Sequence, residues 1–96
     1  MILEHALLRV RAGEERDFEV ALVKAKPLIS ASSGFVAMDV RRACEEPGLY
    51  ILLVHWDSIE DHRDGFRLSD RYVDWRNLLH PFYDALPKVT YFGAPL

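Results

Sequence analysis

The chain lacks the features that several protein classes require. Among its 96 residues there is one cysteine, Cys44, so no disulfide can form within the chain. No apolar run approaches the roughly 20 residues that cross a membrane. The first residues, MILEHALLRV, show neither the basic leader nor the small-residue cleavage site of a secretory signal. These absences predict a cytoplasmic protein that binds no membrane.

Charge and motif content argue against other partners. The net charge is −3 and acidic and basic residues are interspersed, so the chain has no basic patch for nucleic acid. It has no glycine-rich phosphate loop, which argues against a nucleotide cofactor. Acidic residues cluster between Asp57 and Asp64, beside His62, but a charged helix face accounts for that pattern. We therefore predict no cofactor and no metal.

Half of the residues, 50%, are hydrophobic, which suffices for one core. We predict a single domain over residues 1–96. Hydrophobic periodicity and turn residues predict strand, helix, strand, strand, helix, strand. The strands are expected at Ile2 to Val10, Phe35 to Cys44, Leu49 to Trp56 and Lys88 to Phe92.

This order is typical of the ferredoxin-like α+β fold, βαββαβ, a four-stranded antiparallel sheet with two helices on one face. Both faces of the first strand look apolar, and nothing in the chain is left to cover the second sheet face. We therefore expect a homodimer in which two sheets pack face to face, a dimeric α+β barrel. In the first helix, Pro27 is expected to kink the last turns or end the helix early.

The second helical region divides into two segments. Ser58 and Asp61 have capping-box spacing, and a break is expected between Gly65 and Ser69. Ser69 can cap the second segment, which should end near His80 because Pro81 disfavours helical geometry there. One stripe of this segment is strongly aromatic, and it contains Tyr72, Trp75, Leu79, Phe82 and Tyr83.

Three segments carry a family resemblance: RVRAGEE, YILLVHWDSIEDH and GFRLSDRYVDWRNLLHPFYDALPKV. With them the chain resembles the antibiotic biosynthesis monooxygenase (ABM) domains, which form dimeric α+β barrels. That family includes cofactor-free monooxygenases of quinols and polycyclic phenols, haem-degrading enzymes, isomerases and members of unknown activity. Haem-degrading relatives use Asn, Trp and His at slots that fall here on Ala6, near Gly65 and near Arg76. None of the three matches, so haem degradation is disfavoured.

The resemblance implies a cavity between the sheet and the helices. Its expected walls are aromatic, which suits a flat, largely apolar ligand. Cofactor-free oxygenation needs a base to remove a substrate proton and a cation to stabilise the anion. Histidine and arginine are the suitable side chains near neutral pH. The catalytic candidates are His80 first and His62 second, and the substrate-binding candidates are Phe66, Arg67, Tyr72, Trp75 and Tyr83.

Each candidate also has a purely structural interpretation. The aromatic stripe fits a plain core, and Arg67 and Arg76 could pair with neighbouring aspartates. His62 could have a capping or a surface role, and His80 could bond a backbone carbonyl. The leading function is a cofactor-independent monooxygenase of a small aromatic or quinol-type substrate. The alternative is a non-catalytic small-molecule-binding or assembly module. An open cavity with His80 or His62 beside an Arg and a Tyr would favour the enzyme, and collapsed aromatics would favour the alternative.

Overall fold

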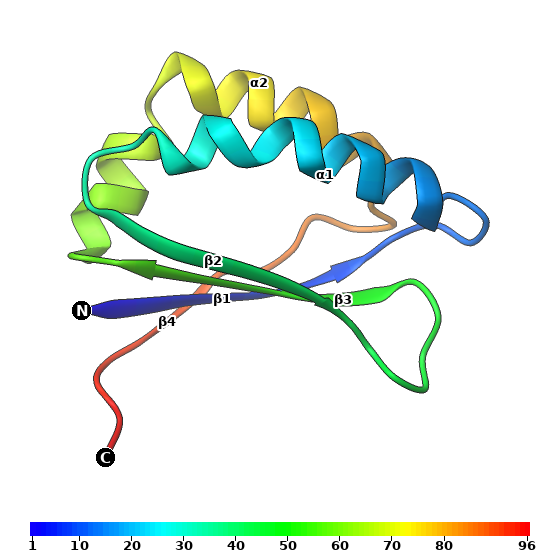
Figure 1. Ribbon diagram of the computed structural model, residues 1–96, viewed down its shortest axis with the longest axis horizontal. Coiled ribbons are helices and arrows are strands. Elements are labelled where there is room, and N and C mark those ends of the chain that lie inside the picture. Colours follow the sequence, from blue (N-terminus) through cyan, green and yellow to red (C-terminus); the bar gives the residue numbers. More distant parts are fainter.

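A computed structural model describes all 96 residues and has the ferredoxin-like α+β fold (Figure 1). Four antiparallel strands form one sheet in the order β2-β3-β1-β4. The elements are β1 (Ile2–Arg9), α1 (Glu15–Ser30), β2 (Phe35–Arg42), β3 (Leu49–Trp56), the π-helical turn η1 (Asp61–Phe66), α2 (Asp70–Leu79), the 3₁₀ turn η2 (His80–Phe82) and β4 (Thr90–Phe92).

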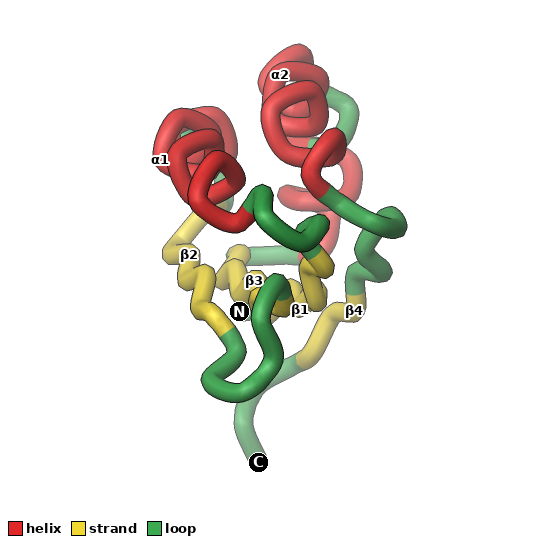
Figure 2. The backbone as a smooth tube through the Cα atoms, turned by 90° about the vertical axis from the view of Figure 1, so that its right-hand side faces the viewer, coloured by secondary structure: helices red, strands yellow, loops and turns green.

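The two helices lie side by side over one face of the sheet, and the other face carries no helix (Figure 2). The core lies between these layers. From α1 it receives a stripe at helical spacing that includes Phe18, Leu22 and Ile29. The sequence predicts that Pro27 kinks the last turns of α1 or ends the helix early, and the structure shows no early end. The helix continues to Ser30, because a proline in the last turn removes one donor only, and the carbonyl of Pro27 still accepts from the N–H of Ala31 at 3.2 Å.

The second strand departs from simple alternation. A bulge between Phe35 and Ala37 shifts the register, so Phe35 pairs with Trp56 and Ala37 with His55. The sequence predicts Phe35 and Ala37 on the same face. The bulge instead places Phe35 on the helix-facing side, where its ring meets Trp56 edge to face at 5.8 Å. The strand also ends at Arg42, and β4 spans only three residues, so both predicted strands are shorter than expected.

The connection from β3 to α2 takes the predicted two-part form. The Ser58 hydroxyl accepts the N–H of Asp61 at 3.2 Å, and the Ser69 hydroxyl accepts that of Tyr72 at 3.3 Å. Between these caps, the N–H of Arg67 bonds the carbonyl of His62 at 2.9 Å, five residues back. This wider π-type turn buries His62 beneath the helices. Gly34 lies against it with φ at +80°, where a Cβ would overlap the side chain of Asp61.

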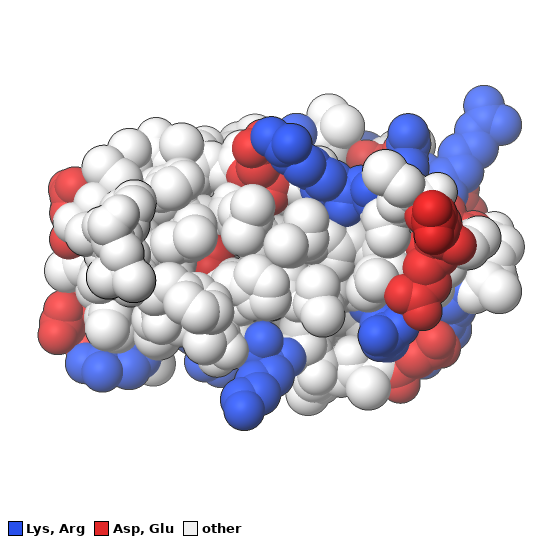
Figure 3. All heavy atoms as spheres, turned by 90° about the horizontal axis from the view of Figure 1, so that it is seen from below, with Lys and Arg blue, Asp and Glu red and all other residues white.

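The sheet face without helices has few charged side chains near its centre, and most of the Lys, Arg, Asp and Glu in view lie around its rim (Figure 3). Cross-strand pairs that include Leu7 with Ile51 and His5 with Leu53 lie on this face and stay half-buried or exposed. Within one chain only the helix-facing side of β1 is buried, so the predicted burial of both faces is not met by the chain alone. None of the helices has the length and apolar character that a membrane crossing requires.

Candidate active site

A pocket of about 330 Å³ opens between the sheet and α2. Its apolar lining comes from the inward side of β1 and β3 and from the segment before β4, and consists of Ala6, Leu8, Leu52, Leu86, Pro87 and Val89. The aromatic walls come from α2 and the residues after it, and they are Tyr72, Trp75 and Tyr83. This volume lies at the lower end of the range found for small-molecule sites.

An acid lies on the sheet side of the pocket. Glu4 lies on the inward face of β1 and is only 3% exposed. Its Oε1 accepts a hydrogen bond from the indole N–H of Trp56 at 2.9 Å and lies 3.4 Å from Nε2 of His62. No side chain of the protein is hydrogen-bonded to its second oxygen. One carboxylate oxygen is thus held by β3 and η1, and the other is free to meet a ligand.

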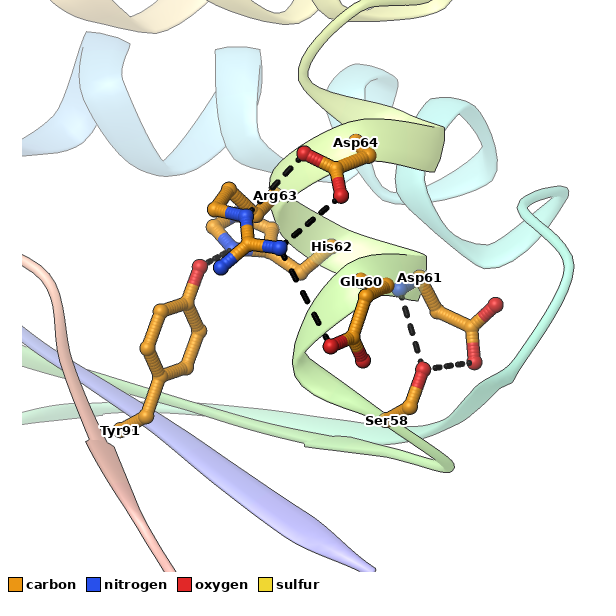
Figure 4. A network of polar contacts seen from close by, with 7 residues as sticks. All are labelled: Ser58, Glu60, Asp61, His62, Arg63, Asp64 and Tyr91. Carbon is orange, nitrogen blue, oxygen red and sulfur yellow. Dashed lines mark hydrogen bonds and ion pairs between the residues drawn. The ribbon is translucent and has the colours of Figure 1, made fainter.

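His62 connects this acid to β4. Its Nδ1 lies 2.6 Å from the hydroxyl of Tyr91, which points toward the imidazole beneath Arg63 (Figure 4). In the neutral ring, the tautomer that fits both neighbours has Nδ1 accepting from Tyr91 and Nε2–H directed at Glu4. Each ring nitrogen then faces a polar neighbour, Tyr91 at hydrogen-bond distance and Glu4 at 3.4 Å. Tyr91, His62, Glu4 and Trp56 form a continuous polar chain inside an apolar fold.

Burial governs the protonation of this chain. It raises the pKa of Glu4 from 4.5 to about 7, opposed by the hydrogen bond from Trp56 and by the charge of Arg67. Burial also lowers the pKa of His62 from 6.5 to about 4, and Arg67 acts in the same direction. Near neutral pH, His62 is therefore neutral, and Glu4 lies close to the midpoint of its titration.

Arg67 brings a positive charge to the pocket rim. Its guanidinium carbon lies 5.6 Å from the centroid of the Tyr72 ring, a cation–π geometry. No carboxylate lies within 4.0 Å of it, so the predicted alternative of pairing with a nearby aspartate is not seen. Arg63, which also lines the pocket, is instead paired with Asp64 at 3.0 Å (Figure 4). Arg67 remains available to an anion.

His80 directly follows the last residue of α2 and is the first residue of η2. Its ring centroid is 5.6 Å from that of Tyr83 and 6.4 Å from that of Tyr72. No group of the protein is hydrogen-bonded to its imidazole, so the alternative in which it bonds a backbone carbonyl is also not seen. Burial, Arg76 and Arg67 lower the pKa of His80, which leaves a neutral ring at the pocket wall.

The family model for antibiotic biosynthesis monooxygenases matches residues 1–78. The chain belongs to this family. It is 41% identical over 92 residues to the uncharacterised YczJ protein of Bacillus subtilis, covering 96% of this chain and 97% of that one. It is also similar to a Bordetella bronchiseptica protein assigned to the antibiotic biosynthesis monooxygenases, with a TM-score of 0.94 and 32% identity over 99% of this chain and 97% of that one.

A second solved structure is similar in fold alone. SnoaB of Streptomyces nogalater, a cofactor-independent oxygenase, superposes with a TM-score of 0.86 at 15% identity, and the match covers 99% of this chain and 93% of that one. The family resemblance seen in the sequence is thus confirmed, as is the fold.

Six of the seven predicted site residues line this one pocket of the ABM domain. They are His62, Arg67, Tyr72, Trp75, His80 and Tyr83. Phe66 does not line it. Its ring is 1% exposed and lies behind the wall, 5.5 Å from Tyr72 and 5.7 Å from Trp75, both edge to face. Phe66 therefore supports the aromatic wall instead of contacting a ligand directly.

Sequence reasoning missed two members of the polar chain that line the pocket, Glu4 and Tyr91. Glu4 did leave a signal, because it interrupts the inward-facing series that continues with Ala6, Leu8 and Val10. An acid in such a series must find partners or titrate abnormally. Tyr91 left no comparable signal, because its role depends on how β4 pairs with β1, where it lies opposite Glu4.

Proposed function

We propose that this ABM protein is a cofactor-independent monooxygenase of a small aromatic or quinol-type substrate. The observation that carries the proposal is the open pocket, in which an unpaired cation, Arg67, lies near acid–base side chains and aromatic walls. Tyr72 and Tyr83 offer hydroxyls to substrate oxygens, and Trp75 offers a ring face. The activity given for SnoaB supports the same reaction class.

The chemistry places three demands on the pocket. A substrate hydroxyl loses its proton to a base, Arg67 stabilises the resulting anion, and the electron-rich ring reduces dioxygen. When an activated ring methylene becomes a carbonyl, one oxygen atom enters the product and the other leaves as water with the two hydrogens of that methylene. The substrate supplies all the electrons, so no bound cofactor is required.

Two side chains can accept the proton. His80 is the base that the sequence favours, and its neutral imidazole has no partner in the protein. Glu4 is the other, and its free oxygen belongs to the same pocket. His62, the second choice from sequence, is less suited, because Tyr91 is hydrogen-bonded to Nδ1 and the carboxylate of Glu4 lies 3.4 Å from Nε2.

A non-catalytic binding module remains the alternative. An assembly module with no ligand would be expected to have its aromatic side chains collapsed against the sheet. The pocket is open instead, and His80, Arg67 and two tyrosines line it. These features favour a protein that handles a ligand, and turnover separates an enzyme from a carrier.

We further propose a homodimer through the helix-free sheet faces. The supporting observation is the apolar centre of that face, with Leu7, Ile51 and Leu53 on adjacent strands (Figure 3). Apolar patches of this kind on small domains usually mark an interface.

Oxygen uptake tests the monooxygenase proposal. Wild-type protein is incubated with a panel of quinols and hydroxylated polycyclic aromatics in an oxygen electrode, and products are identified by mass. We expect Arg67→Ala to lower kcat/KM at least about tenfold, the effect of losing one hydrogen bond to a charged group. The matched control is Arg16→Ala, an exposed arginine on the far side of α1 from the core. Oxygen consumption by none of the panel, or equal rates for both variants, would contradict the proposal.

A further inference from the structure

We propose that Glu4 is the catalytic residue that removes a hydroxyl proton from the bound aromatic ligand, with His62 and Trp56 as positioning residues. The inference deepens the proposed function and rests on it for the oxygenation step. It narrows the ligand class to aromatic molecules that carry an ionisable hydroxyl group. It transfers the role of base from His80 to a residue on the opposite side of the pocket.

Geometry makes Glu4 a directed base. The Trp56 indole and the His62 ring both face Oε1, so the carboxylate cannot rotate freely and Oε2 is left for the ligand. Both neighbours are themselves buried, with Trp56 at 0% and His62 at 4% exposure. A base held by rigid neighbours needs no reorganisation when the ligand binds. His80 has no comparable support, because no group of the protein is hydrogen-bonded to its ring.

The charges around Glu4 fit proton removal. The groups that face it are His62 from η1, Arg67 from the following turn, and Tyr91 from β4. Arg67 is the only full positive charge among them when His62 is neutral. In the transfer, the ligand O–H bond breaks, the proton moves to Glu4, and the negative charge moves from Glu4 to the ligand oxygen. The charge thus leaves a buried carboxylate for a site that Arg67 can reach at the rim.

The step also conserves charge inside the pocket. Before transfer the pocket holds an ionised Glu4 and a neutral hydroxyl, and afterwards it holds a neutral Glu4 and an aryl oxide. The proton returns to solvent or to the reduced oxygen when product leaves. No oxidant, metal or further base is required for this step.

Binding of a matched pair of probes tests the role of Glu4 without any turnover. The probes are 2-naphthol and its methyl ether, which has the same ring and no donor. Naphthol stays protonated up to pH 8, as the phenol of tyrosine does. We expect wild-type protein at pH 8 to prefer naphthol by roughly tenfold or more, the effect of a hydrogen bond to a charged group. The preference should fall as Glu4 is protonated toward pH 6.

Three variants make the experiment decisive. Glu4→Gln keeps the shape of the side chain, and its preference for naphthol should be small and independent of pH. The matched control Glu60→Gln, on the exposed face beside η1, should behave as wild type. His62→Asn removes the imidazole that lies 3.4 Å from Oε1 of Glu4, so the preference for naphthol at pH 8 should weaken because the carboxylate is held less firmly, while its pH midpoint stays that of Glu4. A role for His62 in packing alone would weaken the binding of both probes equally and leave the preference unchanged. Circular dichroism confirms that each variant is folded.

The outcomes separate the two proposals. Three results would overturn the role of Glu4. Glu4→Gln could keep the preference for naphthol, the wild type could bind both probes equally, or the wild type could bind neither. A pH-dependent preference that requires Glu4, in a protein that oxygenates no quinol, would support the acid–base role and contradict the monooxygenase proposal. Oxygenation that survives in Glu4→Gln at the wild-type rate would leave the monooxygenase standing and reassign its base.

Discussion

Replacing Glu4 and replacing His62 should change the pH dependence of the free energy of unfolding in opposite directions. The folded state raises the pKa of Glu4 from 4.5 to about 7 and lowers that of His62 from 6.5 to about 4. Burial is the largest cause of both shifts, so each should persist when the partner is replaced. The variants are Glu4→Gln and His62→Asn.

The signs follow from proton binding in the folded and unfolded states. A neutral Glu4 contributes stability below pH 4.5, and this stability is lost as pH rises from 4.5 to 7. A neutral His62 contributes stability above pH 6.5, and this stability is lost as pH falls from 6.5 to 4. At about 1.4 kcal/mol per pH unit, each window corresponds to about 3 kcal/mol as an upper limit. The windows overlap between pH 4.5 and 6.5, so the two contributions nearly cancel in the wild type.

Each single variant exposes one slope. Glu4→Gln lacks the loss of stability that Glu4 causes, so its free energy of unfolding should rise relative to wild type by up to about 3 kcal/mol from pH 4.5 to 7. His62→Asn lacks the gain of stability that His62 causes, so its free energy of unfolding should fall relative to wild type by a similar amount from pH 4 to 6.5. The carboxylates elsewhere in the chain are common to all the proteins and cancel in these differences.

Urea unfolding at fixed ionic strength and fixed protein concentration measures these free energies. Trp56 and Trp75 are both buried, so their fluorescence reports the transition. A double variant, in which neither group titrates, should again run parallel to wild type between pH 4.5 and 6.5. Difference curves of the same sign for the two single variants, or flat curves for both, would refute the reasoning.

Two further predictions concern the sheet face and His80. Leu53→Asp places a charge at the centre of the helix-free face, and light scattering should show monomer where wild type is dimeric; a wild-type monomer at micromolar concentration would remove the dimer proposal. If Glu4 is the base, His80→Ala should lower kcat/KM for a quinol by less than tenfold in the oxygen-uptake assay. A loss of about 10²-fold, the usual contribution of a general base, would assign the proton transfer to His80 as the sequence predicts.

The sequence predicts the order of elements well because the relevant signals are local. Alternation in the strands, the Ser69 cap and the effect of Pro81 each involve a few neighbouring residues, and the structure contains them all. The departures occur where distant partners decide. The bulge at Phe35 depends on pairing with β3, and the shortness of β4 depends on where it meets β1.

The site follows the same division. The aromatic wall of α2 could be predicted because helical spacing brings Tyr72 and Trp75 to one side. The acid–base chain could not, because its four members come from β1, β3, η1 and β4. The π-type turn that contains His62 does not follow a 3.6-residue periodicity, so helical spacing could not predict that His62 is buried. Of the chain members that sequence reasoning missed, only Glu4, an acid in an inward-facing apolar series, gave a local indication.

Stability and function oppose each other at position 4. An apolar residue there would continue the series of Ala6 and Leu8 and avoid the cost of a buried carboxyl. The fold instead supplies Trp56 and His62 as partners for one oxygen and leaves the other without a partner. The second oxygen is not sealed from solvent, so water can satisfy it until a ligand hydroxyl takes the place of that water. An oxygen that reaches the pocket and is bonded by no protein group can accept the proton of a ligand, which is the property a base needs.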